Sequence, residues 1–136
     1  MNDVTGGCLC GAVKFTASGM SADYHVCHCS KCRRWSSGPM FAAGAAEVRF
    51  EGRENLKLYD SSEWAARGFC ASCGSHVCFY YKPADRYILS IGACDDETRF
   101  RLAGEIFVDE KPESYAFAGD HPRKTGEEFL AEVGAA

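Results

Sequence analysis

The sequence has no excess of basic residues and no long apolar run, and each absence narrows the range of functions. Lys and Arg total 15 against 19 Asp and Glu, which gives a formal net charge of −4. Surfaces that bind nucleic acids or anionic membranes need clustered positive charge, so we expect no nucleic-acid partner and no membrane partner. No apolar run approaches the roughly 18 residues of a membrane-spanning helix. The first residues also lack a basic stretch followed by an apolar one, so we predict no signal peptide and a cytoplasmic location.

Internal repeats, low-complexity linkers and long helical patterns are also missing. Because the composition shows no break, the 136 residues are expected to form one domain, residues 1–136. A parallel βαβ architecture needs long helices between its strands and is therefore not expected. Short apolar runs cut by Gly, Asp, Ser and Pro fill the chain instead, which is typical of β-strands. We expect strands over residues 12–17, 23–27, 40–44, 47–51, 56–60, 64–69, 76–81, 86–92 and 104–109.

The strand and helix signals together predict an all-β fold. In "EVRFE" (47–51) every second side chain is apolar, as in a half-buried antiparallel strand. Only "SKCRRWS" (30–36) and the tail "TGEEFLAEVG" (125–134) favour helix. In the tail, Thr125 and Glu128 have capping-box spacing and Gly134 would end the helix. We therefore predict mainly antiparallel sheets with short helical turns.

Cysteine, in contrast, is abundant, with nine residues in the chain. An odd number cannot pair completely in disulfides, and cytoplasmic thiols stay reduced, so these residues are interpreted first as metal ligands. Cys78 and Cys94 stand alone and are expected to be small buried apolar residues. The other seven occur in three motifs: Cys8 and Cys10 in "CLC", Cys27, Cys29 and Cys32 in "CHCSKC", and Cys70 and Cys73 in "CASCG".

Cys8, Cys10, Cys70 and Cys73, which we call the four-cysteine group, have the spacing of a closed metal site. Cys70 and Cys73, followed by Gly, are typical of a zinc knuckle, and Cys8 and Cys10 would leave the same face of a strand. Four thiolates suit a structural zinc ion that clips the first strand to the middle of the sheet. A redox dithiol at Cys70 and Cys73 is the alternative, but it leaves Cys8 and Cys10 unexplained.

Cys27, Cys29 and Cys32, which we call the cysteine trio, provide three local ligands and leave a fourth coordination position open. An open position distinguishes catalytic from structural zinc, because a substrate atom can occupy it. Three thiolates give the site a net charge of −1, which favours capture of a soft external thiolate over generation of hydroxide. The neighbouring cations would offset that charge and attract an anionic thiol, so they are candidate substrate-binding residues: Lys31, Arg33 and Arg34.

Three other interpretations of this segment stay open. His28 would make the site Cys₃His and merely structural, although adjacent side chains on an extended segment point oppositely. Cys29 and Cys32 would form a redox pair if Cys27 were a spectator. The basic run would simply be a solvated face, as most such runs are.

The motifs together resemble one known family. "GGCLCGAVKF", "CHCSKCRRWSSG" and "RGFCASCGS" occur in the order found in the glutathione-dependent formaldehyde-activating enzyme family, which shares its domain with centromere protein V. These blocks cover residues 6–75, and "EIFVDEKPESY" (105–115) resembles the family's later strand and loop. The chain departs from the family's pattern at two positions. Glu105 stands where the family often has His. In the following loop the family often has Trp after the Pro, and Tyr115 is the nearest aromatic residue here.

The resemblance implies an Mss4-like, zinc-stabilised fold with two zinc ions per chain. The four-cysteine group matches the family's structural ligands, and the trio Cys27, Cys29 and Cys32 matches its catalytic ones. The implied function is a zinc-dependent carbon–sulfur lyase acting on adducts of glutathione or a related small-molecule thiol, such as S-hydroxymethylglutathione formed from formaldehyde. The alternatives are a non-enzymatic zinc-binding protein-interaction module and a thiol redox protein.

Overall fold

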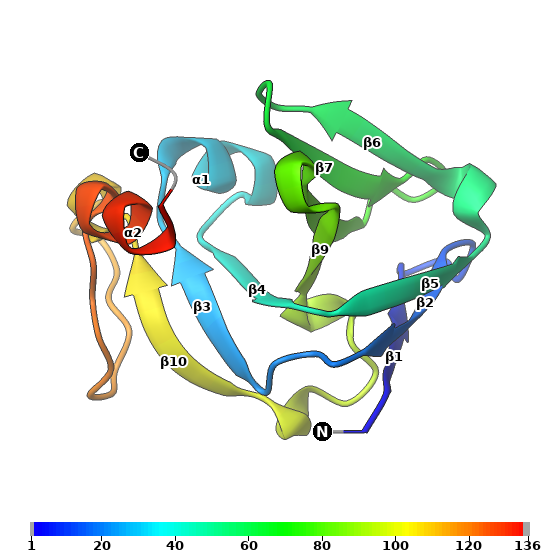
Figure 1. Ribbon diagram of the computed structural model, residues 1–136, viewed down its shortest axis with the longest axis horizontal. Coiled ribbons are helices and arrows are strands. Elements are labelled where there is room, and N and C mark those ends of the chain that lie inside the picture. The colour runs from blue at the N-terminus through cyan, green and yellow to red at the C-terminus, as the bar shows by residue number, and fades with distance from the viewer. Residues whose placement is uncertain (1, 135–136) are drawn as a thin grey trace. The chain divides into compact units, whose positions relative to one another are not determined.

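The computed structural model describes residues 2–134, which form mostly antiparallel β-sheets with two short α-helices (Figure 1). This confirms the predicted all-β class. The chain divides into two compact units, one made of residues 2–22 and 42–101 and the other of residues 23–41 and 102–134. One domain over residues 1–136 stays a prediction. Within the described residues, no helix is long and apolar enough to cross a bilayer.

The first unit contains a three-stranded antiparallel sheet in the order β1 (Val4–Gly7), β2 (Lys14–Ser18), β5 (Glu47–Glu51). Strand β1 was not predicted, because its sequence "VTGG" is short and half glycine. The structure explains one of those glycines. A Cβ atom on Gly6 would lie 2.2 Å from the carbonyl oxygen of Ala93 and 2.4 Å from the ring of Phe15. Only glycine therefore allows β1 to pack this closely.

The first unit also contains a run of antiparallel strands that carries the second half of the four-cysteine group. Residues 42–44 of β4 (Met40–Gly44) pair with β9 (Arg86–Ser90), followed by β8 (His76–Tyr81), β7 (Ala65–Cys70) and β6 (Leu56–Asp60). Most of β7 is buried, and its register shifts between Gly68 and Phe69 just before it ends at Cys70. Buried apolar side chains, including Val4, Val13, Phe15, Leu56, Val77 and Leu89, form this unit's core.

The second unit places β3 (Asp23–Cys27) beside β10 (Arg101–Ile106) and carries both α-helices. Helix α1 (Ser30–Ser36) is the predicted segment, and its N-cap is Cys29, whose sulfur accepts a hydrogen bond from the Cys32 N–H. Helix α2 (Gly126–Val133) begins with the predicted capping box of Thr125 and Glu128. It is followed by Gly134, the predicted end residue, whose backbone has the left-handed conformation of a helix C-cap. Short 3-10 turns occupy Arg53–Asn55, Lys82–Ala84, Ile91–Ala93, Glu97–Arg99 and Val108–Glu110.

The strand predictions fail mainly where a strand ends. Five strands, β3, β4, β5, β6 and β8, have the predicted bounds. The predicted strand 104–109 is wrong at both ends, since β10 runs from Arg101 to Ile106. Phe107 has φ of 57° and begins a 3-10 turn, so the chain leaves the sheet there. The predicted strand 86–92 ends earlier, at Ser90, where another 3-10 turn follows.

Candidate metal centres and active site

The sulfurs of the four-cysteine group lie within 4.8 Å of one another in the first unit. Cys8 and Cys10 lie just after β1, in a turn and not on a strand as predicted, and the Val13 N–H points at the Cys8 sulfur over 3.3 Å. Cys70 ends β7, and the N–H groups of Ser72 and Cys73 point at its sulfur over 3.3 and 3.5 Å. Turns on two distant segments thus direct N–H groups at two of the four sulfurs, and such hydrogen bonds favour the thiolate form that binds a metal ion.

The spacing of these sulfurs fits a tetrahedral zinc ion. Sulfurs bound at roughly 2.3 Å from one ion would lie about 3.8 Å apart, the edge of the tetrahedron. The Cys8–Cys10 and Cys10–Cys70 sulfur distances are 3.7 and 3.8 Å. Both are far too long for a disulfide, and the cysteines are free. The group could therefore hold a metal ion, and its assignment as a structural zinc site stays a prediction.

The charges of these thiols also favour a bound cation. Hydrogen bonds from Ser75 lower the pKa of Cys73 to about 5. The Ala12 N–H lowers the pKa of Cys10, but burial and the neighbouring thiols outweigh it and raise that pKa to about 11. Without a cation, the Cys10 thiol therefore stays protonated at neutral pH. A divalent cation would supply the missing positive charge and release protons as it binds.

The cysteine trio gathers where β3 ends and α1 begins, and its three sulfurs also lie within 4.8 Å of one another. The Cys32 N–H donates to the Cys29 sulfur over 3.3 Å, as in a knuckle turn. Hydrogen bonds from Cys29 and Cys32, then burial, raise the pKa of Cys27, so the Cys27 thiol resists ionisation without a cation. Among the described residues, no fourth Cys, His, Asp or Glu atom joins the three sulfurs.

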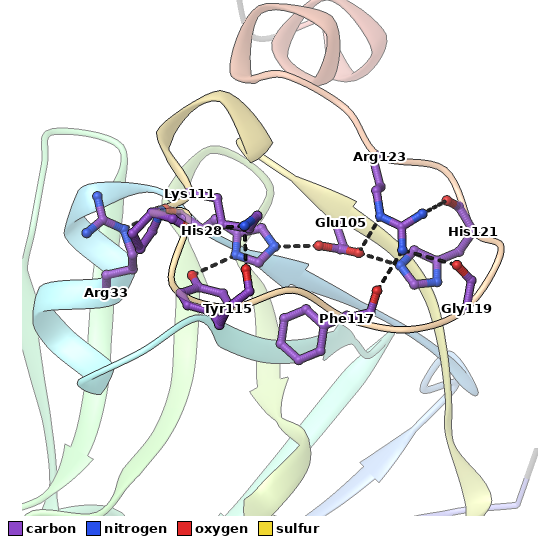
Figure 2. A network of polar contacts seen from close by, with 10 residues as sticks. His28, Arg33, Glu105, Lys111, Tyr115, Phe117, Gly119, His121 and Arg123 are labelled. Carbon is purple, nitrogen blue, oxygen red and sulfur yellow. Dashed lines mark hydrogen bonds and ion pairs between the residues drawn. The ribbon is translucent and has the colours of Figure 1, made fainter.

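His28 lies between two members of the trio in sequence, but its ring is held elsewhere. The side chain is fully buried. Its Nε2 lies 2.7 Å from Oε1 of Glu105, and its Nδ1 lies 2.9 Å from the Tyr115 hydroxyl. Figure 2 shows these two partners bonded to different atoms of the ring. The structure therefore does not bring His28 to the sulfurs as the Cys₃His alternative requires.

Glu105 is the centre of a polar network in the second unit (Figure 2). Its carboxylate is 2 % exposed, and its Oε2 contacts Nε2 of His121 at 2.5 Å and Nε of Arg123 at 2.9 Å. Burial alone would raise the pKa of Glu105. Hydrogen bonds from His121 and His28, together with the Arg123 charge, outweigh burial and hold that pKa below its ordinary value. Glu105 is therefore an ionised acceptor at neutral pH.

The loop after β10 is folded around this network. Arg123 donates to the carbonyl oxygens of Phe117 and Gly119 at 2.8 and 3.1 Å. Lys111 donates to the carbonyl oxygens of Pro112 and Tyr115. The two positions at which the chain departs from the family pattern, Glu105 and Tyr115, thus both bond to His28.

Sequence reasoning did not identify this network as part of the site. Glu105 carried a signal, since it is a charged residue directly before the apolar run "IFV" (106–108). His121 and Arg123 carried none, because they reach Glu105 from beyond a loop.

The predicted substrate-binding cations lie on α1. Lys31 and Arg34 are exposed, whereas Arg33 is half-buried and its Nε donates to the His28 carbonyl oxygen at 2.9 Å. Arg33 therefore anchors the turn of the trio. Substrate binding by these three residues stays a prediction.

Cys78 and Cys94 are buried, as predicted, and are expected to be chemically inert in the folded protein. Burial raises their pKa values to about 12 and about 11. Because the thiolate is the nucleophile, iodoacetamide at pH 8 should leave both unmodified, which peptide mass spectrometry would measure. Alkylation of either one before the protein unfolds would contradict the burial described. Denatured protein, in which both should react, is the control.

The chain is similar to known proteins over most of its length. Residues 3–110 match the family model described as "Glutathione-dependent formaldehyde-activating enzyme". A Schizosaccharomyces pombe protein, called an uncharacterized lyase, is 28% identical over 135 residues, which cover 98% of each chain. A crystal structure of a Rhodobacter sphaeroides protein aligns with a TM-score of 0.58 at 26% identity, covering 88% of this chain and 98% of that one. Because the family match spans well over half of the sequence, the protein belongs to the glutathione-dependent formaldehyde-activating enzyme family.

Proposed function

We propose that the protein is a zinc-dependent carbon–sulfur lyase that makes or cleaves adducts of glutathione or a related thiol, such as S-hydroxymethylglutathione. The observation that carries this proposal is the trio: three clustered sulfurs with no fourth protein donor among the described residues. Family membership and the lyase name of the S. pombe relative support the same reaction class. The four-cysteine group would hold a second, structural ion, giving two per chain.

The residues present fit zinc at the trio, because thiolate sulfur is a preferred zinc ligand and Cys29 receives an N–H···S bond. Zinc held there would supply a Lewis-acidic position that keeps an external thiol ionised at neutral pH. Cys27, Cys29 and Cys32 would hold the ion, and Lys31, Arg33 and Arg34 would attract the carboxylates of the thiol compound.

The proposed reaction balances without an oxidant or reductant. In the forward direction the thiol loses a proton, and its sulfur forms a bond to the carbonyl carbon of formaldehyde. The π electron pair of the carbonyl moves to its oxygen, which takes up a proton. In reverse, the hydroxyl loses a proton, the carbon–sulfur bond breaks, and the thiol is released. The protein's part is to ionise and place the thiol beside the carbonyl carbon.

Exchange NMR with ¹³C-formaldehyde and glutathione tests this proposal. Magnetisation should transfer between formaldehyde hydrate and the S-hydroxymethyl adduct faster with the protein than without it. The matched control is Cys94→Ala, which removes a cysteine outside both groups and should leave the catalysed rate unchanged. Equal exchange rates with and without the wild-type protein would remove formaldehyde as the substrate.

The basic run should affect affinity for the thiol more than turnover. We expect Lys31→Ala and Arg34→Ala each to raise KM for glutathione about 2- to 5-fold. An exposed ion pair contributes at most about 1 kcal/mol of binding free energy, which corresponds to a change of about 5-fold. The reaction with neutral 2-mercaptoethanol should not change, because it has no carboxylate to bind. Steady-state kinetics with both thiols measure this, and Lys57→Ala, an exposed lysine on β6, is the control. Equal effects on both thiols would contradict the carboxylate-binding role.

A further inference from the structure

His28 is anchored at every polar atom that it offers. Its backbone N–H donates to the carbonyl oxygen of Ile106 at 3.1 Å, and its own carbonyl oxygen accepts from Arg33 Nε at 2.9 Å. Its ring nitrogens contact Glu105 at 2.7 Å and Tyr115 at 2.9 Å. The peptide between Cys27 and Cys29 is therefore held from β10, from α1 and from the loop after β10.

The direction of these bonds follows from Glu105. Arg123 and His121 both contact Oε2, so the carboxylate accepts bonds and Oε1 has no proton to give. The Nε2 atom of His28 must therefore carry the hydrogen and donate it to Glu105. In the neutral ring Nδ1 is then an acceptor, and the Tyr115 hydroxyl donates to it. One buried carboxylate thus fixes the tautomer of His28 and the orientation of its ring.

Stability alone does not explain why a carboxylate is buried at Glu105. A buried carboxylate needs several partners to offset its lost hydration, and apolar residues of similar volume are often equally stable or more stable. Here the partners converge on the residue between two sulfurs whose relative positions decide how a metal ion is held. Groups behind a metal site that orient its ligands commonly change metal affinity when they are replaced.

We propose that His28 is a positioning residue for the cysteine trio and that Glu105, by fixing the His28 ring, sets the trio's geometry before a metal ion binds. His28 does not bind the ion. It holds the backbone from which Cys27 and Cys29 project. This inference rests on the proposed function, because it treats the trio as the active metal site. It adds Glu105 to that site as a residue that contacts the His28 ring and not the sulfurs.

Replacement of Glu105 by glutamine tests this in the full-length, metal-loaded protein. The side chain keeps its size, but its amide cannot accept at both ends, so the bonds to His28 and to Arg123 cannot both be kept. We expect zinc affinity at the trio, measured by competition with a zinc-binding dye, to fall about 10- to 100-fold. The affinity of the four-cysteine group, which serves as an internal reference, should not change. Glu113→Gln, an exposed carboxylate in the loop after β10, is the matched control and should bind like the wild type.

A spectroscopic readout separates positioning from general stability. With Co²⁺ at the trio, the visible bands report the ligand angles, and they should shift in intensity or position in Glu105→Gln. Tyr115→Phe removes a single hydrogen bond from a half-buried residue and should lower trio affinity about 2- to 10-fold, so it decides the matter if Glu105→Gln does not fold. Unchanged affinity and bands at the trio, or equal losses at both groups, would overturn the inference. These measurements need no turnover, so they are independent of whether formaldehyde is a substrate.

Discussion

Replacement of Cys70 by serine is expected to leave a chain without a cooperative unfolding transition at pH 7 and 25 °C. Cys70 is fully buried, its sulfur accepts two backbone N–H groups, and it lies 3.8 Å from the Cys10 sulfur. In the proposed site this sulfur helps to join the end of β7 to the segment that follows β1. Structural zinc contributes about 10–16 kcal/mol in small zinc domains, which is as much as the roughly 5–15 kcal/mol of a typical domain's total stability.

Circular dichroism and urea unfolding of purified Cys70→Ser measure this effect. The control is Cys94→Ala, which also removes a buried cysteine but no proposed ligand and should retain one transition. We propose that residues 1–136 fold as one domain, so the wild type should unfold in a single step. A Cys70→Ser protein that melts with the wild-type midpoint would show that the four-cysteine group does not hold the fold together.

Replacement of Cys29 by serine is expected to abolish catalysis while the fold is retained. Cys29 is the N-cap of α1, and its sulfur accepts the Cys32 N–H. Serine is among the best N-cap residues, so its hydroxyl can keep that bond and preserve the helix start. The change therefore removes a proposed metal ligand with little damage to local structure. We expect the catalysed exchange rate to fall by more than about 100-fold, because even groups behind the ligands are worth 10- to 100-fold.

The same exchange NMR experiment and a thermal melt measure both parts of this prediction. The midpoint of unfolding should stay within a few degrees of the wild type. Ser30→Ala, one residue further along the chain, keeps all three sulfurs and is the matched control for activity. A Cys29→Ser protein with more than a tenth of wild-type activity would show that the trio is not the reacting centre. A binding module or a redox protein would then have to be reconsidered.

The strands were predictable where local pattern and turn residues agree. In β5, Glu47, Arg49 and Glu51 are exposed and alternate with half-buried Val48 and Phe50, as the sequence pattern predicted. Both helices lie where they were predicted, but only α2 was marked by capping residues in the sequence, since the N-cap of α1 is Cys29. The gathering of the cysteine sulfurs into two groups followed from motif spacing. The end of β10 was not predictable, since the positive φ of Phe107 falls on a residue type that seldom adopts it.

The polar network was not predictable, because every one of its ionic contacts is long-range. Glu105 lies 77 residues from His28 and 16 from His121 along the chain. No periodicity links these positions, and a charged residue in an apolar strand indicates only that some partner must exist. Two of the partners, His121 and Arg123, reach Glu105 only because the chain after β10 folds back onto that strand. The contacts that hold His28 between the sulfurs of the trio therefore depend on tertiary structure, whereas the sulfurs themselves can be identified from the sequence.

We propose that the trio holds an ion with one coordination position left for an external thiol, and a glutathione titration of Co²⁺-loaded protein would detect a thiol in that position. The near-ultraviolet absorbance of thiolate bound to Co²⁺ grows with the number of sulfurs on the ion. We predict a saturable rise of about one third in the trio's share of that absorbance, as three thiolates become four. Cys27→Ala should show no rise, because two remaining thiolates are expected not to retain the trio's ion. No change in the wild type, or the same change in Cys27→Ala, would show that the trio does not hold an ion with an open position.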